Sequence, residues 1–302
     1  MSTPFSAALS ASAQAAAGQH YPQGALYVVA TPIGNLADIS LRALHVLGLV
    51  DAIACEDTRH THTLLRAYGI ERAGGALIAL HQHNEAQAAH GVVEQLRQGR
   101  RVAYVSDAGT PGISDPGARL VAAVRAAGLR AIPLPGASSI TALLSVAGMA
   151  EAHEGGFVFG GFLPTKAGER AHAVQALAAE PRAVLLLEAP HRIEALALAL
   201  ASLGPRLVTL GRELTKQFEE LATVAAADLG AYLAQDSNRV RGEFALVLHP
   251  GQPTAAQAPG QRVLELLLAH VPLKTAVQLA AEISGESRNA LYQRALALKA
   301  DT

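Results

Sequence analysis

The chain has 302 residues, 50% of them hydrophobic, with a formal net charge of −1 and a single cysteine. This length suits about two domains with a large core, and the near-zero charge gives no global basic field of the kind that marks nucleic-acid-binding proteins. One cysteine excludes an internal disulfide framework and most cysteine-based zinc sites, and Cys55 follows an apolar run and is expected to be buried.

The first 24 residues are rich in alanine, serine and glutamine, and no lysine or arginine precedes Arg42. A secretory signal needs a positive amino-terminal region and a mitochondrial transit peptide needs arginines, so residues 1–24 are predicted to be a flexible tail. No uncharged apolar stretch of roughly 18 residues is present, which predicts no membrane-spanning helix and no membrane partner. We therefore expect a soluble, cytoplasmic protein.

Short apolar runs alternate with longer helical patterns in the next part of the chain. Strands are expected at residues 26–30, 52–55, 76–80, 102–105 and 131–134, and helices between them at 41–50, 60–68, 85–97 and 118–127. This alternation predicts an α/β layer with a largely parallel sheet, whose strands are apolar throughout because both faces are covered.

A second set of elements follows. Strands are expected at residues 157–162, 184–187, 207–210 and 244–248, and helices at 167–179, 192–203 and 229–234. A boundary near residue 136 then gives an amino-terminal α/β domain at residues 25–136 and a second α/β domain at 137–250. The uncharged segment 251–260 is typical of a linker.

Residues 261–302 are predicted to form a small helical module resembling a helix-turn-helix. One helix face carries Ala276, Val277, Ala280 and Ile283. Ser284 and Gly285 break this helix, and Ser287 is placed to cap the next one, which carries Arg288 and Arg294. The module could contact RNA, or it could be a docking or dimerisation helix pair.

Two loops rich in glycine and proline follow expected strands. Residues 31–35 contain Pro32 and Gly34, which favour a rigid turn that another group can approach closely. Residues 106–117 contain three glycines and two prolines, which favours a backbone shaped around a ligand. Loops at the carboxyl ends of parallel strands are where α/β proteins bind ligands, so both loops are candidate binding elements.

Within the second loop, the two acidic residues are expected to differ in role. Asp107 lies at the end of the preceding strand and is placed to contact a ligand. Asp115 precedes a proline and is expected mainly to cap the helix that follows. Ser138 and Ser139 open a later helix, where their hydroxyls could cap the helix or face a bound carboxylate.

Polar and titratable side chains gather at the ends of the second and third expected strands. They are Glu56, Asp57, Arg59, His81, His83, Asn84 and Glu85. Clusters at adjacent strand ends predict a polar pocket. The two alternate histidines have no clear third ligand, so no metal is predicted. A Gly-x-Ser-x-Gly elbow, a Gly-x-Gly-x-x-Gly fingerprint and a P-loop lysine are all absent, which disfavours hydrolase, dinucleotide and nucleotide-phosphate sites.

Basic residues follow the strands of the second half. They are Lys166, Arg192, Arg212 and Lys216. Lysine and arginine at strand ends can meet a phosphate backbone, and interdomain ion pairs are the alternative.

With these motifs the chain resembles the tetrapyrrole methylase superfamily and, within it, the ribosomal RNA small subunit methyltransferase I family, which methylates the ribose 2′-oxygen of a cytidine in 16S ribosomal RNA. The resemblance runs from about residue 26 to the carboxyl terminus. Its motifs lie at residues 30–35, 56–59, 83–85, 107–117, 161–164, 190–193, 212–216 and 242–243.

The resemblance implies the tetrapyrrole-methylase fold, with two α/β domains, S-adenosyl-L-methionine (AdoMet) in the interdomain cleft, a homodimer, and 16S rRNA of the small ribosomal subunit as partner. By position it places AdoMet near Pro32, Gly34, Asp107, Gly109, Thr110, Pro111, Ser138, Ser139, Glu188, Ala189, Gly242 and Phe244. The chain departs from the family pattern at Ala137, where the family has proline, and at Ala189, where it has serine. A glycine usual in the family is missing from residues 221–227.

A ribose hydroxyl is a poor nucleophile, so methyl transfer to it calls for positioning and for a base that takes the proton. The candidate bases are Glu56, Asp57 and Glu85, with Arg59 and Asn84 orienting the RNA. Phosphate contacts are expected at Lys166, Arg192, Arg212, Lys216, Arg288 and Arg294. Two alternatives stay open at this point: a methylase of corrin-type tetrapyrroles, and a nucleic-acid-binding regulator that uses the carboxyl-terminal helices.

Overall fold

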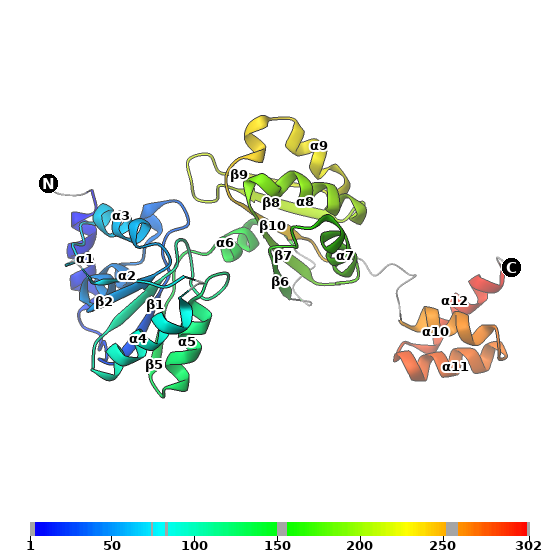
Figure 1. Cartoon of the computed structure of the whole chain (residues 1–302). Coiled ribbons are helices and arrows are strands. Elements are labelled where there is room, and N and C mark those ends of the chain that lie inside the picture. The colour runs from blue at the N-terminus through cyan, green and yellow to red at the C-terminus, as the bar shows by residue number, and fades with distance from the viewer. Residues whose placement is uncertain (1–3, 74, 82–83, 150–155, 252–258, 301–302) are drawn as a thin grey trace.

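The computed structural model describes residues 4–73, 75–81, 84–149, 156–251 and 259–300. These residues form two α/β lobes and a carboxyl-terminal helical bundle (Figure 1). The first lobe holds one five-stranded sheet and the second lobe holds another. None of the helices in the described ranges is long and apolar enough to cross a membrane.

The sheet of the first lobe is parallel throughout and has the strand order β3-β2-β4-β1-β5. Its strands are β1 (Ala25–Val29), β2 (Ala52–Cys55), β3 (Leu77–Ala79), β4 (Val102–Val105) and β5 (Arg130–Leu134). The helices between them are α2 (Leu41–Leu49), α3 (Thr58–Tyr68), α4 (Glu85–Arg97) and α5 (Gly117–Ala126). Every strand expected in this part of the chain is present, and all the strands end at the same edge of the sheet.

Both faces of this sheet are covered, as the unbroken apolar runs predict. On one face Tyr27 packs with Leu44 of α2 and Leu65 of α3. On the other face the neighbouring Leu26 packs with Val92 of α4, Leu120 of α5 and Tyr104, among others. Successive side chains of a strand point to opposite faces, so each strand contributes to two cores. Cys55 is fully buried in the first of these cores, as expected.

The amino-terminal segment is not the flexible tail that its composition predicts. Residues Ser6–Ala16 form helix α1. Phe5 and Leu9 pack against the core of the first lobe, and the Phe5 ring meets the Tyr68 ring edge-on at 5.0 Å. Alanine is the best helix former, and a few apolar side chains are enough to dock such a helix. The absence of targeting features therefore said nothing about structure in this segment.

The second lobe contains a mixed sheet with the order β6-β7-β10-β8-β9. Its strands are β6 (Phe157–Gly161), β7 (Ala183–Glu188), β8 (Leu207–Arg212), β9 (Glu220–Ala225) and β10 (Phe244–Leu248). Its helices are α6 (Ser139–Val146), α7 (Ala167–Ala178), α8 (Ile193–Leu200) and α9 (Leu229–Ala234). Only β6 and β7 pair in parallel, and the other neighbouring strands are antiparallel.

Strand β9 is absent from the sequence-based prediction. It pairs with β8 at the edge of the sheet and alternates between half-buried and exposed residues. Such an edge strand lacks the continuous apolar run by which the other strands were recognised. Short 3₁₀ helices connect the main elements at Leu36–Asp38, Pro190–Arg192, Ala201–Leu203, Ala226–Asp228 and Ser237–Val240.

Three helices form the carboxyl-terminal bundle: α10 (Pro259–Leu268), α11 (Leu273–Ser284) and α12 (Arg288–Ala300). Leu264, Ala280 and Leu291 bring one residue from each helix to a common core. Gly285 ends α11 in a left-handed conformation, and the Ser287 hydroxyl accepts a hydrogen bond from the Ala290 N–H at 3.2 Å, as the sequence predicts. Ile283, which we expected on the apolar face, is instead 65% exposed.

Candidate active site between the lobes

Three loops at the carboxyl edge of the first sheet are joined by hydrogen bonds. The Thr31 and Gly109 backbones exchange two, at 3.0 and 3.1 Å, which ties the loop after β1 to the loop after β4. The Thr110 hydroxyl donates to the Ala137 carbonyl at 2.9 Å, which adds the loop after β5. The glycine- and proline-rich segments thus form one connected wall, as their shared position at strand ends predicts.

The loop between β4 and α5 is folded around one carboxylate. Asp115 accepts hydrogen bonds from the Tyr104 hydroxyl at 2.8 Å, the Gly117 N–H at 2.8 Å and the Gly112 N–H at 2.6 Å. Asp115 thus binds the first N–H of α5, that of Gly117, although the N-cap position of the helix is Pro116 and not Asp115 as expected. Burial, followed by the Asp115 charge, raises the pKa of Tyr104, so this phenol stays a donor.

A cavity of about 460 Å³ lies between the two lobes. Its apolar walls come from both lobes and include Ile33, Ile140, Leu187 and Leu214. Seven of the residues predicted to bind cofactor line it: Gly109, Thr110, Ser138, Ser139, Glu188, Ala189 and Phe244. Residues far apart in the sequence therefore meet at one site, which we call the central cavity.

Five residues predicted to bind cofactor lie outside the lining of the central cavity. They are Pro32, Gly34, Asp107, Pro111 and Gly242. A Cβ on Gly34 would lie 2.3 Å from Cγ of Lys216, and a Cβ on Gly242 would lie 2.5 Å from Cγ of Glu213. These two glycines therefore allow close packing around the segment after β8.

That segment also joins the lobes directly. The Asn35 N–H donates to the Thr215 hydroxyl at 3.2 Å. Glu213 and Thr215 have φ angles of 50° and 66°, which are uncommon for residues with a side chain. Backbone strain of this kind persists only where surrounding contacts enforce it, here at the border between the lobes beside the central cavity.

Glu188, at the end of β7, is the most deeply buried acid of the central cavity, with 3% of its surface exposed. Its Oε1 accepts the Ala189 N–H at 3.0 Å and lies 2.9 Å from Nε of Arg192, whose N–H is not aligned for a hydrogen bond. Oε2 is buried without a hydrogen-bond partner among the described residues. A buried acceptor left unsatisfied is costly, so this oxygen is suited to a ligand donor.

Glu56, at the end of β2, reaches the central cavity from the first lobe. Burial raises the pKa of its carboxyl group, and the nearby charges of Asp107 and Asp115 raise it further. A hydrogen bond from the Asp107 N–H to Oε1, at 3.2 Å, offsets part of this rise. A carboxylate with a raised pKa beside a cavity has the properties of a general base.

Asp57 and Arg59 are turned toward each other instead. Asp57 caps α3 by accepting the Arg59 N–H at 2.8 Å, and its two oxygens bind the Arg59 guanidinium at 3.1 and 2.8 Å. These bonds hold the pKa of Asp57 well below its usual range. The Arg59 side chain is 90% exposed, and neither residue lines the central cavity.

Asn84 and Glu85 do not line the central cavity. Both polar atoms of the Asn84 side chain are hydrogen-bonded: Oδ1 accepts from the His81 N–H and Nδ2 donates to the Ala79 carbonyl, both at 2.9 Å. Glu85 forms an ion pair with Arg119 of α5. His83, which the sequence grouped with these residues, lies outside the described residues.

Each of the six cations predicted to contact RNA has a carboxylate partner. The pairs are Lys166–Glu169, Arg192–Glu188, Arg212–Glu220, Lys216–Glu213 with Glu243, Arg288–Glu282 and Arg294–Glu286. Both members of each pair belong to the same lobe or to the bundle, so these are not the interdomain pairs considered as an alternative. Lys166 remains 80% exposed, whereas Arg192 and Arg212 are largely enclosed.

Several lining residues escaped the sequence analysis. The central cavity also contains Leu187 and Gly211, together with Ile113 and Leu214, which the sequence analysis covered only as parts of longer motifs. Its apolar members have the same sequence signature as core residues, so composition alone does not reveal them. Gly211 carried a usable signal: it is a glycine inside a strand, which often marks a close approach, and its Cβ would lie 2.9 Å from Leu143 and Leu214.

Comparison with known proteins places these features in a family. Residues 25–230 match the model of the Tetrapyrrole (Corrin/Porphyrin) Methylases, and residues 254–299 match that of the RsmI C-terminal HTH domain. A protein of Escherichia coli O157:H7 named ribosomal RNA small subunit methyltransferase I is 47% identical over 278 residues, covering 91% of this chain and 95% of that protein. A protein of the same name from Pseudomonas aeruginosa is 46% identical, covering 90% and 97%.

Solved structures show the same fold at lower identity. Uroporphyrin-III-C-methyltransferase from Thermus thermophilus aligns with a TM-score of 0.52 and 21% identity, covering 75% of this chain and 94% of that one. A diphthine synthase aligns with a TM-score of 0.56 and 15% identity, covering 74% and 90%. Together with the family model and the full-length relatives, these findings show that the chain belongs to the tetrapyrrole methylases and, within them, to the ribosomal RNA small subunit methyltransferase I family.

Proposed function

We propose that this protein transfers a methyl group from AdoMet to the ribose 2′-oxygen of a cytidine in the 16S rRNA of the small ribosomal subunit. The observation that carries the proposal is the acidic central cavity, which is bordered by a carboxyl group with a raised pKa, Glu56. The names of the full-length relatives support ribosomal RNA of the small subunit as the substrate.

The residues of the central cavity fit AdoMet. Four carboxylates line it, and no lysine or arginine does so among the described residues. Glu188 and Glu243 are paired outside the lining, with Arg192 and Lys216, whereas Glu56 and Asp115 have no such cation partner among the described residues. AdoMet carries a sulfonium and an ammonium group against one carboxylate, so it is a net cation that the carboxylates of Glu56 and Asp115 attract. The lining disfavours ligands with several phosphates for the same reason.

The shape of the lining fits the same ligand. Apolar walls from both lobes suit the flat adenine ring, and the unsatisfied Oε2 of Glu188 can accept a hydrogen bond from a hydroxyl or amino group of the cofactor. Gly109 has a φ of +78°, and a Cβ there would lie 3.1 Å from Ile33. This glycine keeps the wall close to the ligand without a side chain in between.

When bound, AdoMet supplies an electrophilic methyl group on sulfur. The chain's own contribution is to position the acceptor oxygen and to take its proton. We assign the proton to Glu56, because the pKa of its carboxyl group is raised whereas that of Asp57 is lowered by Arg59. With AdoMet bound, the Glu56 carboxylate would take the proton of the ribose hydroxyl as that oxygen accepts the methyl group, and the cofactor would leave as its neutral thioether with the carbon–sulfur electron pair.

The proposed substrate implies the cytoplasm, where small ribosomal subunits are found. A net charge of −1 and the pairing of the six predicted cations argue against tight, unselective binding to free RNA, and favour an assembled subunit that is recognised at several points. We infer a homodimer as the active form. The exposed Phe218, just before the edge strand β9, and Leu221, within it, offer an apolar surface for a second copy.

The test is methyl transfer from tritium-labelled AdoMet to purified small subunits from a strain that lacks this enzyme. The proposal predicts label in one cytidine, located on the ribose, together with AdoMet binding by calorimetry without added metal. A parallel reaction offers a precorrin-type tetrapyrrole. Label in the tetrapyrrole alone would establish a corrin methylase, label on a base would overturn the 2′-oxygen assignment, and RNA binding without any transfer would point to a regulator.

A further inference from the structure

A second cavity adjoins the central one on the side of the first lobe. It has a volume of about 530 Å³ and shares Glu56, Ile113, Ser114 and Asp115 with the central cavity. Because Glu56 lies in both linings, the candidate base stands at their junction. A substrate oxygen held in the second cavity would therefore lie beside the same carboxylate that borders the central cavity.

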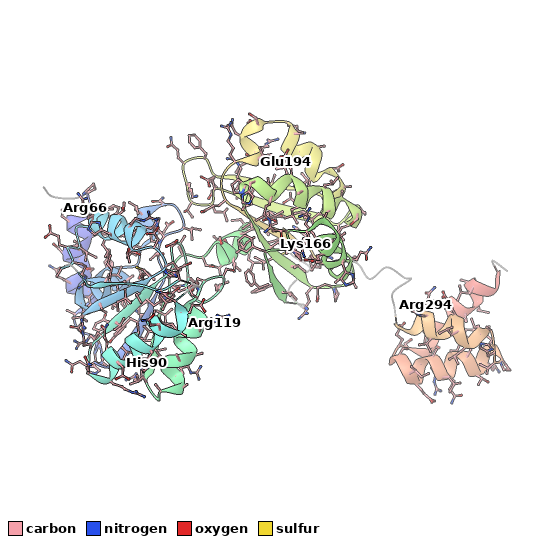
Figure 2. The ribbon with its side chains drawn as sticks, viewed as in Figure 1. Arg66, His90, Arg119, Lys166, Glu194 and Arg294 are labelled. Carbon is pink, nitrogen blue, oxygen red and sulfur yellow. The ribbon has the colours of Figure 1, made fainter. Side chains whose placement is uncertain are left out.

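A third cavity, of about 920 Å³, continues the path over the outer surface of the first lobe. It shares Glu85 and Arg119 with the second cavity and runs between α4 and α5, with Asn84, His90 and Arg97 among its lining residues. Figure 2 shows Arg119 on α5 and His90 on the neighbouring helix α4. We call the second and third cavities together the acceptor groove.

Charge changes along the acceptor groove. The inner part is lined by the carboxylates of Glu56, Glu85 and Asp115, with Arg119 as its one lysine or arginine among the described residues. The outer part is lined by the guanidinium groups of Arg97 and Arg119, which are paired with Glu94 and Glu85 and keep their remaining N–H donors. A nucleotide has the matching polarity, because its ribose hydroxyls donate to carboxylates whereas its phosphates need cations.

We propose that the acceptor groove holds the RNA strand, and that Arg119 binds a backbone phosphate next to the ribose presented to Glu56. This assignment rests on the proposed function, since it concerns how the same reaction positions its RNA. Arg119 is 80% exposed at the point where the two parts of the groove meet. It is a substrate-positioning residue that the sequence analysis did not identify.

The contacts of Arg119 prepare it for this role. Its Nη1 is held by Glu85, whose side chain is only 14% exposed. A guanidinium has five N–H donors in a planar fork, so a terminal nitrogen fixed on one carboxylate leaves other donors directed elsewhere. Arg59, although its side chain is even more exposed, has both Nε and Nη2 on Asp57 and lies outside the groove.

The experiment compares the wild type with Arg119→Ala and Arg119→Lys in methyl transfer to small subunits, using the full-length protein. Arg125→Ala is the matched control, because Arg125 is also exposed on α5 but lines none of the three cavities among the described residues. A phosphate contact away from the reacting atoms is uniform binding, so Arg119→Ala should raise KM about tenfold and change kcat less than about threefold.

Two further readouts separate phosphate binding from a structural role. Loss of one phosphate contact should flatten the dependence of log affinity on log salt concentration by about one unit of slope, and Arg119→Lys should restore most of that slope. AdoMet affinity and the unfolding midpoint should stay at wild-type values. If Arg119→Ala matches Arg125→Ala in KM and salt slope while the wild type is active, the inference is wrong. If the wild type itself transfers no methyl to subunits, the proposed function is the part that fails.

Discussion

The two lobes build their shares of the central cavity in different ways. In the first lobe all strands are parallel, so Glu56 after β2 and Asp107 after β4 reach the same edge because every strand ends there. In the second lobe β10 runs antiparallel to β7 and β8, so its first residue, Phe244, pairs with Glu188 and Arg212 at the ends of those strands. A strand start and two strand ends form this edge.

This difference decides what sequence reasoning can find. In a parallel sheet, a search for polar residues after apolar runs leads to the site, and it led to Glu56 here. In a mixed sheet the same search also collects residues such as Arg212, which is enclosed in an ion pair with Glu220. The following predictions test whether Glu56 of the first lobe supplies the base and Glu188 of the second lobe contributes to cofactor binding.

The largest effect is expected from the first lobe. Glu56→Gln removes the proposed base while keeping its shape, so the rate of methyl transfer should fall by roughly 10²–10⁴-fold. AdoMet affinity, measured by calorimetry, should change much less. Because the base must be ionised and its pKa is raised, the wild-type rate should also fall as the pH drops through that raised value. A Glu56→Gln enzyme with the full rate would transfer the role of base to another group or to solvent.

A change in the second lobe should weaken the binding of AdoMet. Glu188→Gln removes the charge of the buried acid that lines the central cavity. A hydrogen bond to a charged group contributes about 1.5–3 kcal/mol, so AdoMet affinity should weaken by roughly ten- to a hundredfold. Glu194→Gln, an exposed change on α8, is the control and should leave the affinity unchanged (Figure 2). Equal affinities for the two variants would remove Glu188 from the binding site.

A third change tests whether the loop of the first lobe is held as tightly as its contacts suggest. A Cβ on Gly117 would lie 2.1 Å from Cε1 of Tyr104 and 2.6 Å from Oδ1 of Asp115. Gly117→Ala should therefore destabilise the fold by about 1–3 kcal/mol in chemical denaturation. Gly91→Ala is the matched control: this helical glycine has open space around it, so alanine should stabilise by up to about 1 kcal/mol. Effects of the same sign would contradict the steric argument.

The extent of successful prediction follows the strength of each physical signal. Continuous apolar runs located the strands of both lobes except β9, whose alternating pattern belongs to an edge. Glu56 and Glu188 came from strand ends and from family resemblance. Arg119 had no such signal, because it lies on the first turn of a helix. Its proposed role can be recognised only when the structure shows that α4 and α5 border one groove. Pairing between distant charges is likewise invisible in the sequence.

The smallest effect concerns Asp107, which the family resemblance placed beside AdoMet. In the structure its Oδ1 accepts the Asp57 N–H at 3.3 Å, and the residue lies outside the lining of the central cavity. Its charge contributes to the raised pKa of Glu56. Asp107→Asn keeps an acceptor oxygen but removes the charge, so the Glu56 carboxylate becomes easier to ionise. The acid limb of the pH–rate profile should then move to lower pH by less than about one unit, since Asp107 is exposed to solvent and its field is screened. AdoMet affinity should stay within about threefold of the wild type.

A direct cofactor contact predicts the opposite pattern, a loss of affinity of about 1–3 kcal/mol with no movement of the acid limb. Calorimetry and a pH–rate profile on the same preparation therefore distinguish a residue that tunes the base from one that holds the cofactor.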